Sequence, residues 1–291
     1  MKLYYYINTG HRVGLDRLRR SAPVINALHE MGVDVRMLTN DFRAGEYAKE
    51  QFGISHYVSV DVVRNIANIA TPSDALVFDS EEESRAMWRD MASYFYKFIR
   101  ISDNPDDFAE EGEILISSMK EVGDAPQADI VDPRYFTSTE HKNETVYFWG
   151  DDDYEERLLG LSDAFKGLNV TLLEGYYFFM QYGDELAEKF QSVEESESYD
   201  EVLMQAGRFI SSSPQTTLEA LASGSKPIYL KKPGVSDAWD QKMERLGIPI
   251  ITTFDKEAIQ KALLDNVNYQ EKVLQKEAVQ EIARYIKYNV N

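Results

Sequence analysis

Short apolar runs alternate with longer helical patterns along the first half of the chain. Short runs rich in β-branched, aromatic and other apolar residues predict strands at residues 3–7, 33–38, 56–60, 75–78, 98–101 and 114–116, and helical spacing predicts helices at about 19–30 and 46–52. Strands that alternate with helices in this way are typical of βαβ units and parallel sheets. We therefore predict an α/β domain in this half.

A second alternating series follows a stretch rich in turn signals. Residues 124–143 include Pro126 and Pro133 and are largely polar, so we place an interdomain linker near their end. Strands are then predicted at 145–149, 170–173, 208–210, 227–230 and 248–251, and helices at 154–166, 198–206, from 218, at 239–246 and from about 256. The pattern predicts two Rossmann-like parallel-sheet domains, at 1–142 and 143–270, and a C-terminal helical segment at 271–291.

The composition restricts the classes of partner. The chain is 43% hydrophobic and 28% charged, which is normal for a globular protein, and its 31 basic and 50 acidic side chains give a net charge of −19. Such an acidic surface repels nucleic acids and anionic lipids, so an anionic ligand needs a local positive pocket. The absence of cysteine excludes disulfides and thiolate metal sites, and the spacing of the four histidines makes a zinc site improbable. Without a signal-like segment or a long apolar run, we expect a cytoplasmic protein with no membrane span.

The first strand-to-helix junction carries a candidate site. Gly10 and Gly14 permit close approach of the backbone to a ligand, and His11 is a candidate proton acceptor. Loops at the carboxyl ends of parallel strands are where ligands bind in open α/β sheets. The same junction holds the densest positive patch of this acidic chain, made of Arg12, Arg17, Arg19 and Arg20. The alternative interpretation is an ordinary turn with an exposed histidine and surface arginines.

A hydroxyl-rich turn before a predicted helix is the second candidate. Residues 211–213 are all serine and come directly before a helix start, where N–H groups and the helix dipole favour a phosphate. The alternative is purely structural. Ser213 followed by Pro214 suits an N-cap and the first helical position, and Thr216 with Glu219 fits a capping box.

An acidic triplet after a strand is the third candidate. Gly150 is followed by Asp151, Asp152 and Asp153, which could hold a hard cation such as Mg²⁺. Such runs are more often the solvated first turn of a helix. Asp79 also ends a buried apolar run, where catalytic groups are common, but it can equally precede a helix start.

The order of these pieces resembles a known fold family. The chain is similar to the GT-B nucleotide-sugar proteins, nearest to the UDP-sugar hydrolase of pseudaminic acid biosynthesis and, more distantly, to the lipid-II-forming N-acetylglucosaminyltransferase. The motifs that carry the likeness are the strand ending at Gly150, the segment 210–224 with its Glu-x-x-Ala helix, and the pair Asp240-Gln241. The resemblance implies two lobes facing each other across a cleft that holds the ligand, with the last helix packing back across the lobes.

The resemblance also implies residue roles. Glu219 would receive the ribose hydroxyls, and the nucleotide and its phosphates would lie near Gly10, Gly14, Arg17, Gly150, Ser212, Ser213, Thr216, Thr217, Asp240 and Gln241. The chain departs from the family where Ser213-Pro214 replaces a Gly-Gly pair and where Leu15 stands in place of a histidine.

Two functions remain open at this point. The first is a glycosyltransferase-like enzyme of surface-polysaccharide biosynthesis that transfers sugar from a nucleotide-sugar to a sugar or glycan acceptor, or hydrolyses the nucleotide-sugar. His11 or Asp16 would act as base, and Arg12 would stabilise the departing diphosphate. This enzyme would need no cofactor beyond its substrate and no metal. The second is a non-catalytic sugar- or nucleotide-binding protein on the same scaffold; a magnesium-dependent phosphatase or epimerase is a weaker third, and the oligomeric state is left open.

Overall fold

The chain forms two compact units, each described here by itself. The computed structural model describes residues 1–291 except 82–83, 128, 138–140, 179–181, 266 and 271–272. Unit 1 consists of Met1–Gly10, Arg17–Pro133 and Gln275–Asn291, and unit 2 consists of His11–Asp16 and Arg134–Leu274. The units therefore divide at Pro133, before the boundary predicted at residue 142. Part of the predicted linker, at 128 and 138–140, lies outside the described residues.

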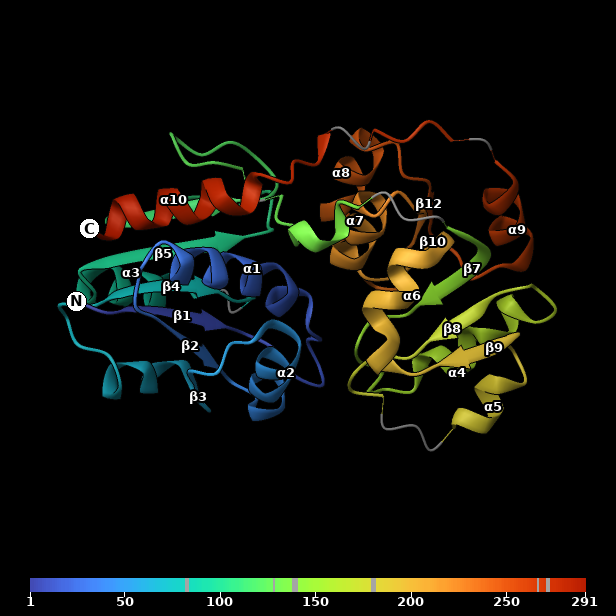
Figure 1. Ribbon diagram of the computed structural model, residues 1–291, viewed down its shortest axis with the longest axis horizontal. Helices are drawn as coiled ribbons and strands as arrows, with labels where there is room; N and C mark the ends of the chain where they lie inside the picture. Colours follow the sequence, from blue (N-terminus) through green and yellow to red (C-terminus); the bar gives the residue numbers. More distant parts are fainter. Residues whose placement is uncertain (82–83, 128, 138–140, 179–181, 266, 271–272) are drawn as a thin grey trace. The chain divides into compact units, whose positions relative to one another are not determined.

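Unit 1 is built on a six-stranded parallel sheet with the order β3-β2-β1-β4-β5-β6 (Figure 1). The strand order changes direction between β1 and β4: β2 and β3 follow on one side of β1, and β4, β5 and β6 follow on the other side. The strands are β1 (Leu3–Ile7), β2 (Val35–Thr39), β3 (Tyr57–Ser59), β4 (Ala75–Asp79), β5 (Lys97–Ser102) and β6 (Glu113–Ser117). Both β1 and β4 are buried along their whole length, which explains why they read as continuous apolar runs.

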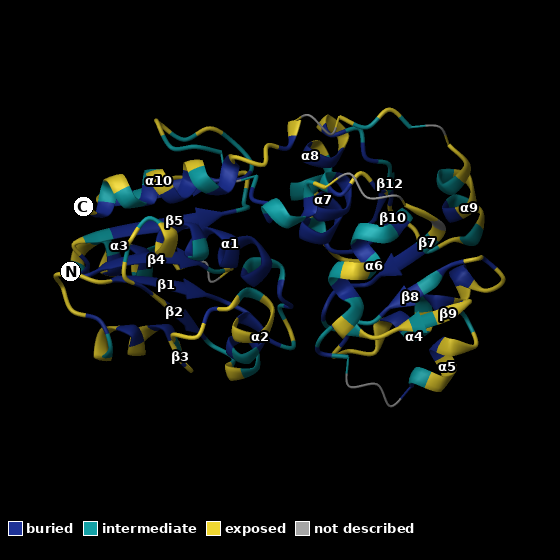
Figure 2. Ribbon diagram, viewed as in Figure 1, coloured by how far each residue is buried: buried dark blue, intermediate teal, exposed yellow. Residues whose placement is uncertain are grey.

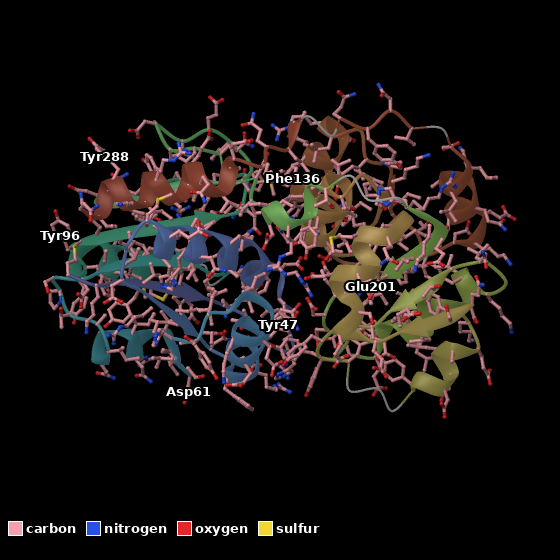
Figure 3. The ribbon with its side chains drawn as sticks, in the orientation of Figure 1. Tyr47, Asp61, Tyr96, Phe136, Glu201 and Tyr288 are labelled. Carbon is pink, nitrogen blue, oxygen red and sulfur yellow. The ribbon has the colours of Figure 1, made fainter. Side chains whose placement is uncertain are left out.

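Helices cover the sheet of unit 1 and bury apolar faces against it (Figure 2). They are α1 (Asp16–Glu30), α2 (Phe42–Phe52), the 3₁₀ helix η1 (Val63–Asn68), α3 (Arg85–Tyr94) and α10 (Ala278–Val290). The last of these contacts β5, so the end of the chain completes this unit. Its buried face includes Ile282 and Ile286, whereas Tyr288 is 84% exposed and points outward (Figure 3).

A buried charge cluster lies at the carboxyl end of β4. Asp79 is fully buried and accepts hydrogen bonds from the Arg20 guanidinium (Nε to Oδ2, 2.8 Å) and from Ser21 Oγ (2.9 Å). Arg20 also donates to Asp103 (3.0 Å). Burial disfavours the ionised form of Asp103, but Arg20 and Arg17 outweigh it and hold the pKa of Asp103 below its ordinary value. These charges neutralise one another inside the unit.

Unit 2 repeats the same architecture with a second six-stranded parallel sheet, in the order β12-β11-β10-β7-β8-β9 (Figure 1). Its strands are β7 (Lys142–Phe148), β8 (Thr171–Leu173), β9 (Ser192–Glu194), β10 (Ala206–Ser211), β11 (Lys226–Leu230) and β12 (Ile250–Ile251). In this sheet the order reverses between β7 and β10. Its core includes Tyr147, Phe165 and Phe190, whose rings stack, and Leu172 and Ile210.

The helices of unit 2 are short. They are α4 (Arg157–Leu161), α5 (Gly183–Ala187), α6 (Tyr199–Gln205), α7 (Pro214–Ala222), α8 (Asp240–Arg245) and α9 (Lys256–Leu264), with 3₁₀ turns η3 (Ser162–Phe165), η4 (Ser196–Ser198) and η5 (Asp237–Trp239). A further 3₁₀ turn, η2 (Pro133–Tyr135), lies where the two units divide. In the part of the chain that the structure describes, no helix has the length and apolarity needed to cross a bilayer.

The α/β class and the parallel sheets are confirmed, with differences in detail. The helix predicted at 154–166 begins later, at Arg157, as α4 followed by η3; Glu156 is its N-cap, and the Asp153 carboxylate accepts from the N–H groups of its first two residues. Strand β9 was not predicted, since Ser192, Val193 and Glu194 make no apolar run. The helical tail predicted from about 256 consists of the separate helices α9 and α10.

Candidate functional site

The switch point of the second sheet positions the candidate site. Strands β7 and β10 are neighbours, and the chain continues from them toward opposite edges of the sheet. Ligands of open α/β sheets bind outside the carboxyl ends of two such strands. The loop after β7 contains Gly150 and the three aspartates, and the loop after β10 contains Ser212 and Ser213. Both were singled out in the sequence because they follow predicted strands.

Gly150 allows a close approach at this edge. Its φ of 130° is disfavoured for residues with a side chain, and a Cβ there would lie 2.9 Å from Lys232 Nζ. Gly175, in the loop after β8, packs against the same turn, because a Cβ would lie 2.3 Å from the Gly150 carbonyl oxygen. The backbone of the loop after β7 is therefore held between two other segments of the unit.

The three aspartates of this loop have separate hydrogen-bond partners. Asp153 accepts from the N–H groups of Arg157 (3.0 Å) and Leu158 (2.9 Å) at the start of α4, and from Tyr182 Oη (2.9 Å). Asp151 accepts from the N–H of Leu15 (3.0 Å). Within the described ranges, no cluster of three histidine or acidic side chains is arranged to hold a metal ion.

Segment His11–Asp16 belongs to unit 2 and lies against this loop. The His11 ring is 5.2 Å from the ring of Tyr154, and the Arg12 guanidinium lies 4.6 Å from the centre of the same ring. Gly14, with a φ of 83°, faces Asp151. Thus His11, Arg12 and Gly14, all predicted from the first junction, lie beside the loop after β7.

The start of α7 also contacts this segment. Ser213 Oγ donates to the carboxylate of Asp16, 2.8 Å from each oxygen, and accepts from the N–H of Thr216 (3.0 Å) as the N-cap of α7. Two sites predicted separately, at Asp16 and at Ser213, are therefore joined by a hydrogen bond.

The N–H groups at the start of α7 are largely engaged within the protein. Ser212 N–H donates to the Phe148 carbonyl (2.8 Å), Ser213 N–H to Ser211 Oγ (3.0 Å), and Thr217 N–H to the Ser213 carbonyl (3.0 Å). Pro214 has no N–H. Hydroxyls are engaged as well, since Thr217 Oγ1 donates to the Ser213 carbonyl (2.7 Å) and Ser212 Oγ pairs with Tyr147 Oη (3.1 Å). In this structure the helix start is not an open cradle for a phosphate.

Glu219 is not accessible to a ribose in this structure. It is completely buried, and its carboxylate accepts from Tyr199 Oη (2.7 Å) and Gln215 Nε2 (3.0 Å). Thr216 is buried beside it and pairs with the same tyrosine (2.8 Å). The capping-box interpretation also fails for Glu219, because the residue that caps α7 is Ser213, not Thr216.

The four remaining predicted residues have other side-chain partners. Gly10 and Arg17 directly flank the segment His11–Asp16 in the chain but are counted with unit 1, where Gly10 faces Asp41 and Arg17 lies 3.7 Å from Asp79. Asp240 Oδ2 accepts from Lys231 Nζ (2.9 Å) in unit 2, and Gln241 is exposed.

A pocket of about 380 Å³ adjoins this junction within unit 2. Sequence reasoning missed most of its residues, although Lys231 and Lys232 directly follow a predicted strand in an acidic chain. Glu156, at the end of the loop beside the pocket, has a φ of 53°, a strained conformation for a residue with a side chain. The residues that line the pocket include Arg12, Trp149, Asp152, Tyr154, Arg157 and Lys232.

The pocket combines cations, a carboxyl group and aromatic faces. Lys232 Nζ lies 4.5 Å from the centre of the Trp149 ring, and burial lowers the pKa of Lys232 although nearby aspartates oppose this shift. Burial raises the pKa of Asp152 to about 6, against the effect of Lys232 and His11. Its carboxylate accepts a hydrogen bond from the N–H of Tyr154 (3.0 Å). Titratable groups with shifted pKa values that line one pocket mark it as a candidate functional site.

Comparison with known proteins places the fold. No family model matches the sequence, and no curated protein matches it. The UDP-GlcNAc 2-epimerase of Methanocaldococcus jannaschii, in complex with UDP-GlcNAc and UDP, is similar with a TM-score of 0.62 at 10% identity, over 99% of this chain and 100% of that chain.

Two solved glycosyltransferases are similar over equally long stretches. The spinosyn rhamnosyltransferase SpnG has a TM-score of 0.60 at 11% identity, over 100% of both chains. A glycosyltransferase from Rickettsia africae ESF-5 has a TM-score of 0.55 at 11% identity, over 99% of this chain and 93% of that chain. These likenesses concern the fold alone. The chain has the GT-B type of α/β fold, which was the predicted fold class, with one parallel six-stranded sheet in each unit.

Proposed function

We propose that the protein acts on a nucleotide-activated sugar, as a glycosyltransferase-like enzyme that transfers the sugar or hydrolyses its bond to the nucleotide. The observation that carries the proposal is the hydrogen-bonded junction in unit 2, where Asp16 meets Ser213 at 2.8 Å and Leu15 meets Asp151 at 3.0 Å. This junction lies at the switch point of a nucleotide-type sheet. Solved proteins of the same fold are described with UDP-GlcNAc and UDP, and with thymidine diphosphate.

Roles follow from the side chains that the junction brings together. His11 is the group best placed to take a proton from an acceptor hydroxyl or from water, because it is partly exposed beside the pocket, whereas Asp16 is bound to Ser213. Arg12 is exposed and lines the pocket, so it would stabilise the charge that develops on a departing diphosphate. Gly14 and Gly150 would let the ligand approach the backbone. A role in making surface polysaccharides is part of the proposal.

Isothermal titration with UDP, GDP, dTDP and CMP tests the proposal. At least one nucleotide should bind with micromolar to millimolar affinity, and the matching nucleotide-sugar should release free nucleotide on incubation. No heat with any of the four at millimolar concentration would contradict the proposal.

A non-catalytic binding protein on the same scaffold is the second candidate. It is favoured by the contact between Asp16 and Ser213, which occupies one candidate base, and by the engaged N–H groups at the start of α7. This candidate predicts nucleotide binding that survives His11→Ala, without turnover. Release of nucleotide by the wild type that is lost in His11→Ala would exclude it.

A further inference from the structure

The pocket beside the junction holds positive charge that the protein does not neutralise directly. Lys232 makes no hydrogen bond or ion pair with any described residue, whereas its neighbour Lys231 is bound to Asp237 and Asp240. Arg157 donates to the Pro233 carbonyl (2.7 Å) through one of its five N–H groups, which leaves donors for a ligand. Arg12, from the segment His11–Asp16, is the third cation that lines the pocket. Three cations line this pocket together with the carboxyl groups of Asp152, Asp153 and Glu155. Of these acids, Asp153 is already bound to the N–H groups at the start of α4 and to Tyr182 Oη.

The start of α7 cannot take over the binding of an anion as it stands. Its first N–H groups already donate to Phe148, Ser211 and Ser213. The carboxylate of Asp16 also lies on the Ser213 hydroxyl, and a phosphate there would be repelled by it. In the pocket, by contrast, Arg12, Arg157 and Lys232 make no ion pair among the described residues, so they can pair with a diphosphate.

Asp152 opposes the same anion when it is ionised. It lines the pocket together with Lys232, and the charged groups that face it are Lys232, His11 and Asp153, with Arg12, Glu155 and Arg157 on the pocket wall. A carboxylate beside a diphosphate costs free energy unless it is protonated. Because the pKa of Asp152 is already raised to about 6, its protonation near neutral pH costs little free energy.

We propose that this pocket binds the diphosphate of the ligand and that Asp152 takes up one proton from solvent as the diphosphate enters. The inference rests on the proposed function and deepens it, since it names the anion subsite and its dependence on pH. No covalent bond changes in this step. The bound state carries a neutral Asp152 beside Lys232 and the diphosphate.

Calorimetry measures the proton directly. UDP-N-acetylglucosamine, GDP-mannose and dTDP-glucose are used as probes, because a diphosphate esterified at both ends lacks the phosphate group that titrates near pH 6. For the tightest of these, the binding enthalpy at pH 7 should differ between buffers of unlike ionisation enthalpy by an amount that reports uptake of up to one proton. The affinity should fall above pH 6, by at most about tenfold for each pH unit.

Three variants identify the titrating group. Asp152→Asn should abolish the proton uptake and flatten the pH dependence, whereas Asp184→Asn, an exposed change elsewhere in unit 2, should retain both. Imidazoles also titrate near neutral pH, so His11→Gln is needed as well. If Asp152 is the group, His11→Gln retains the proton uptake.

A matched pair of lysines tests the pocket. Lys232 follows β11 and Lys226 begins it, so the two lie at opposite ends of one strand. Lys232→Met should weaken binding at least tenfold, and Lys226→Met should change it less than twofold. Far-UV circular dichroism confirms that each variant is folded.

The outcomes separate the two proposals. If none of the nucleotides or nucleotide-sugars binds, the proposed function fails and the diphosphate assignment fails with it. If one binds with full affinity to Lys232→Met, or without proton uptake by the wild type, the proposed function stands and this inference is overturned.

Discussion

The carboxyl edges of the two sheets use charge in opposite ways. In unit 1, Asp79 is buried with Arg20 and Ser21, and Arg20 reaches Asp103 as well, so opposite charges satisfy each other. In unit 2, Lys232 has no ion pair among the described residues, and Asp152 has a pKa raised to about 6. Both edges belong to six-stranded parallel sheets whose order reverses at the centre.

The contrast shows that topology alone does not make a binding site. The same fold can use the polar ends of its strands to stabilise itself or leave them available to a ligand. Buried, mutually paired charges indicate structure, and partly buried charges that line a pocket with shifted pKa values indicate function. Substitutions in both units test this difference, and the largest effect is expected from the buried charge cluster of unit 1.

Asp79→Asn should destabilise unit 1 by about 3 to 5 kcal/mol, because it leaves the buried Arg20 without its main counter-charge. Hydrogen–deuterium exchange should show faster exchange in unit 1 and little change in unit 2. The control is Asp61→Asn, an exposed aspartate of the same unit (Figure 3). A loss below about 1 kcal/mol would mean that the cluster contributes little to stability.

Gly175→Ala should cost about 1 to 3 kcal/mol, because the new Cβ would lie 2.3 Å from the Gly150 carbonyl oxygen and 2.5 Å from Asp151 Cα. The backbone atoms it meets cannot rotate away as a side chain could. Gly160→Ala is the matched control, since nothing lies within 4 Å of its Cβ and it is in helix α4. That change should stabilise by about 0.5 to 1 kcal/mol, as urea unfolding would show.

Asp152→Asn should stabilise the protein at pH 7.5 by about 1 to 2 kcal/mol, a figure reduced for partial exposure of the side chain. The pKa of Asp152 in the folded state, about 6, is above the ordinary value of 3.8, so ionisation disfavours folding. Stability should therefore fall as the pH rises from about 4 to 6 and stay low above it.

Thermal unfolding at pH 4 and pH 7.5 checks this sign. The variant and wild type should agree at pH 4 and differ at pH 7.5, and Asp184→Asn should show no such divergence. Equal stability of Asp152→Asn and wild type at both values would remove the evidence for a desolvated carboxyl group.

Ser213→Ala should cost about 1 to 2 kcal/mol, and Ser84→Ala only about 0.5 to 1. Both serines cap helices, but Ser213 also donates to Asp16, whereas Ser84 accepts from the Met87 N–H at 3.3 Å. Melting temperatures of the two variants compare the caps. An equal loss would mean that the bond to Asp16 adds no stability.

The fold was largely predictable because the interior positions of the buried parallel strands are apolar. Residues 75–79 and 226–230 illustrate this, with nearly every position buried. Strand β9 was not predicted, because two of its three residues are exposed and polar. The first turns of α1 and α2 were also missed, since their polar residues carry no helical apolar spacing.

Part of the candidate site could be predicted from the sequence, because its residues follow predicted strands. His11, Asp16, Gly150 and Ser213 all follow predicted strands, and the structure places them together in unit 2. The burial of Glu219 was not visible, since it depends on Tyr199, a residue of another helix. The unpaired state of Lys232 among the described residues could not be predicted for a similar reason, because tertiary contacts decide whether a lysine finds a counter-charge.

Helix α10 gives the chain an unusual order of folding. Residues 278–290 supply buried apolar side chains to unit 1 although they are synthesised after the last strand of unit 2. During synthesis, the stretch Arg134–Leu274 can therefore fold together with residues 11–16 before helix α10 of unit 1 has been made. The surface of β5 that α10 covers therefore stays exposed until residues 278–290 have been made, so unit 1 cannot complete its core before unit 2 has been synthesised.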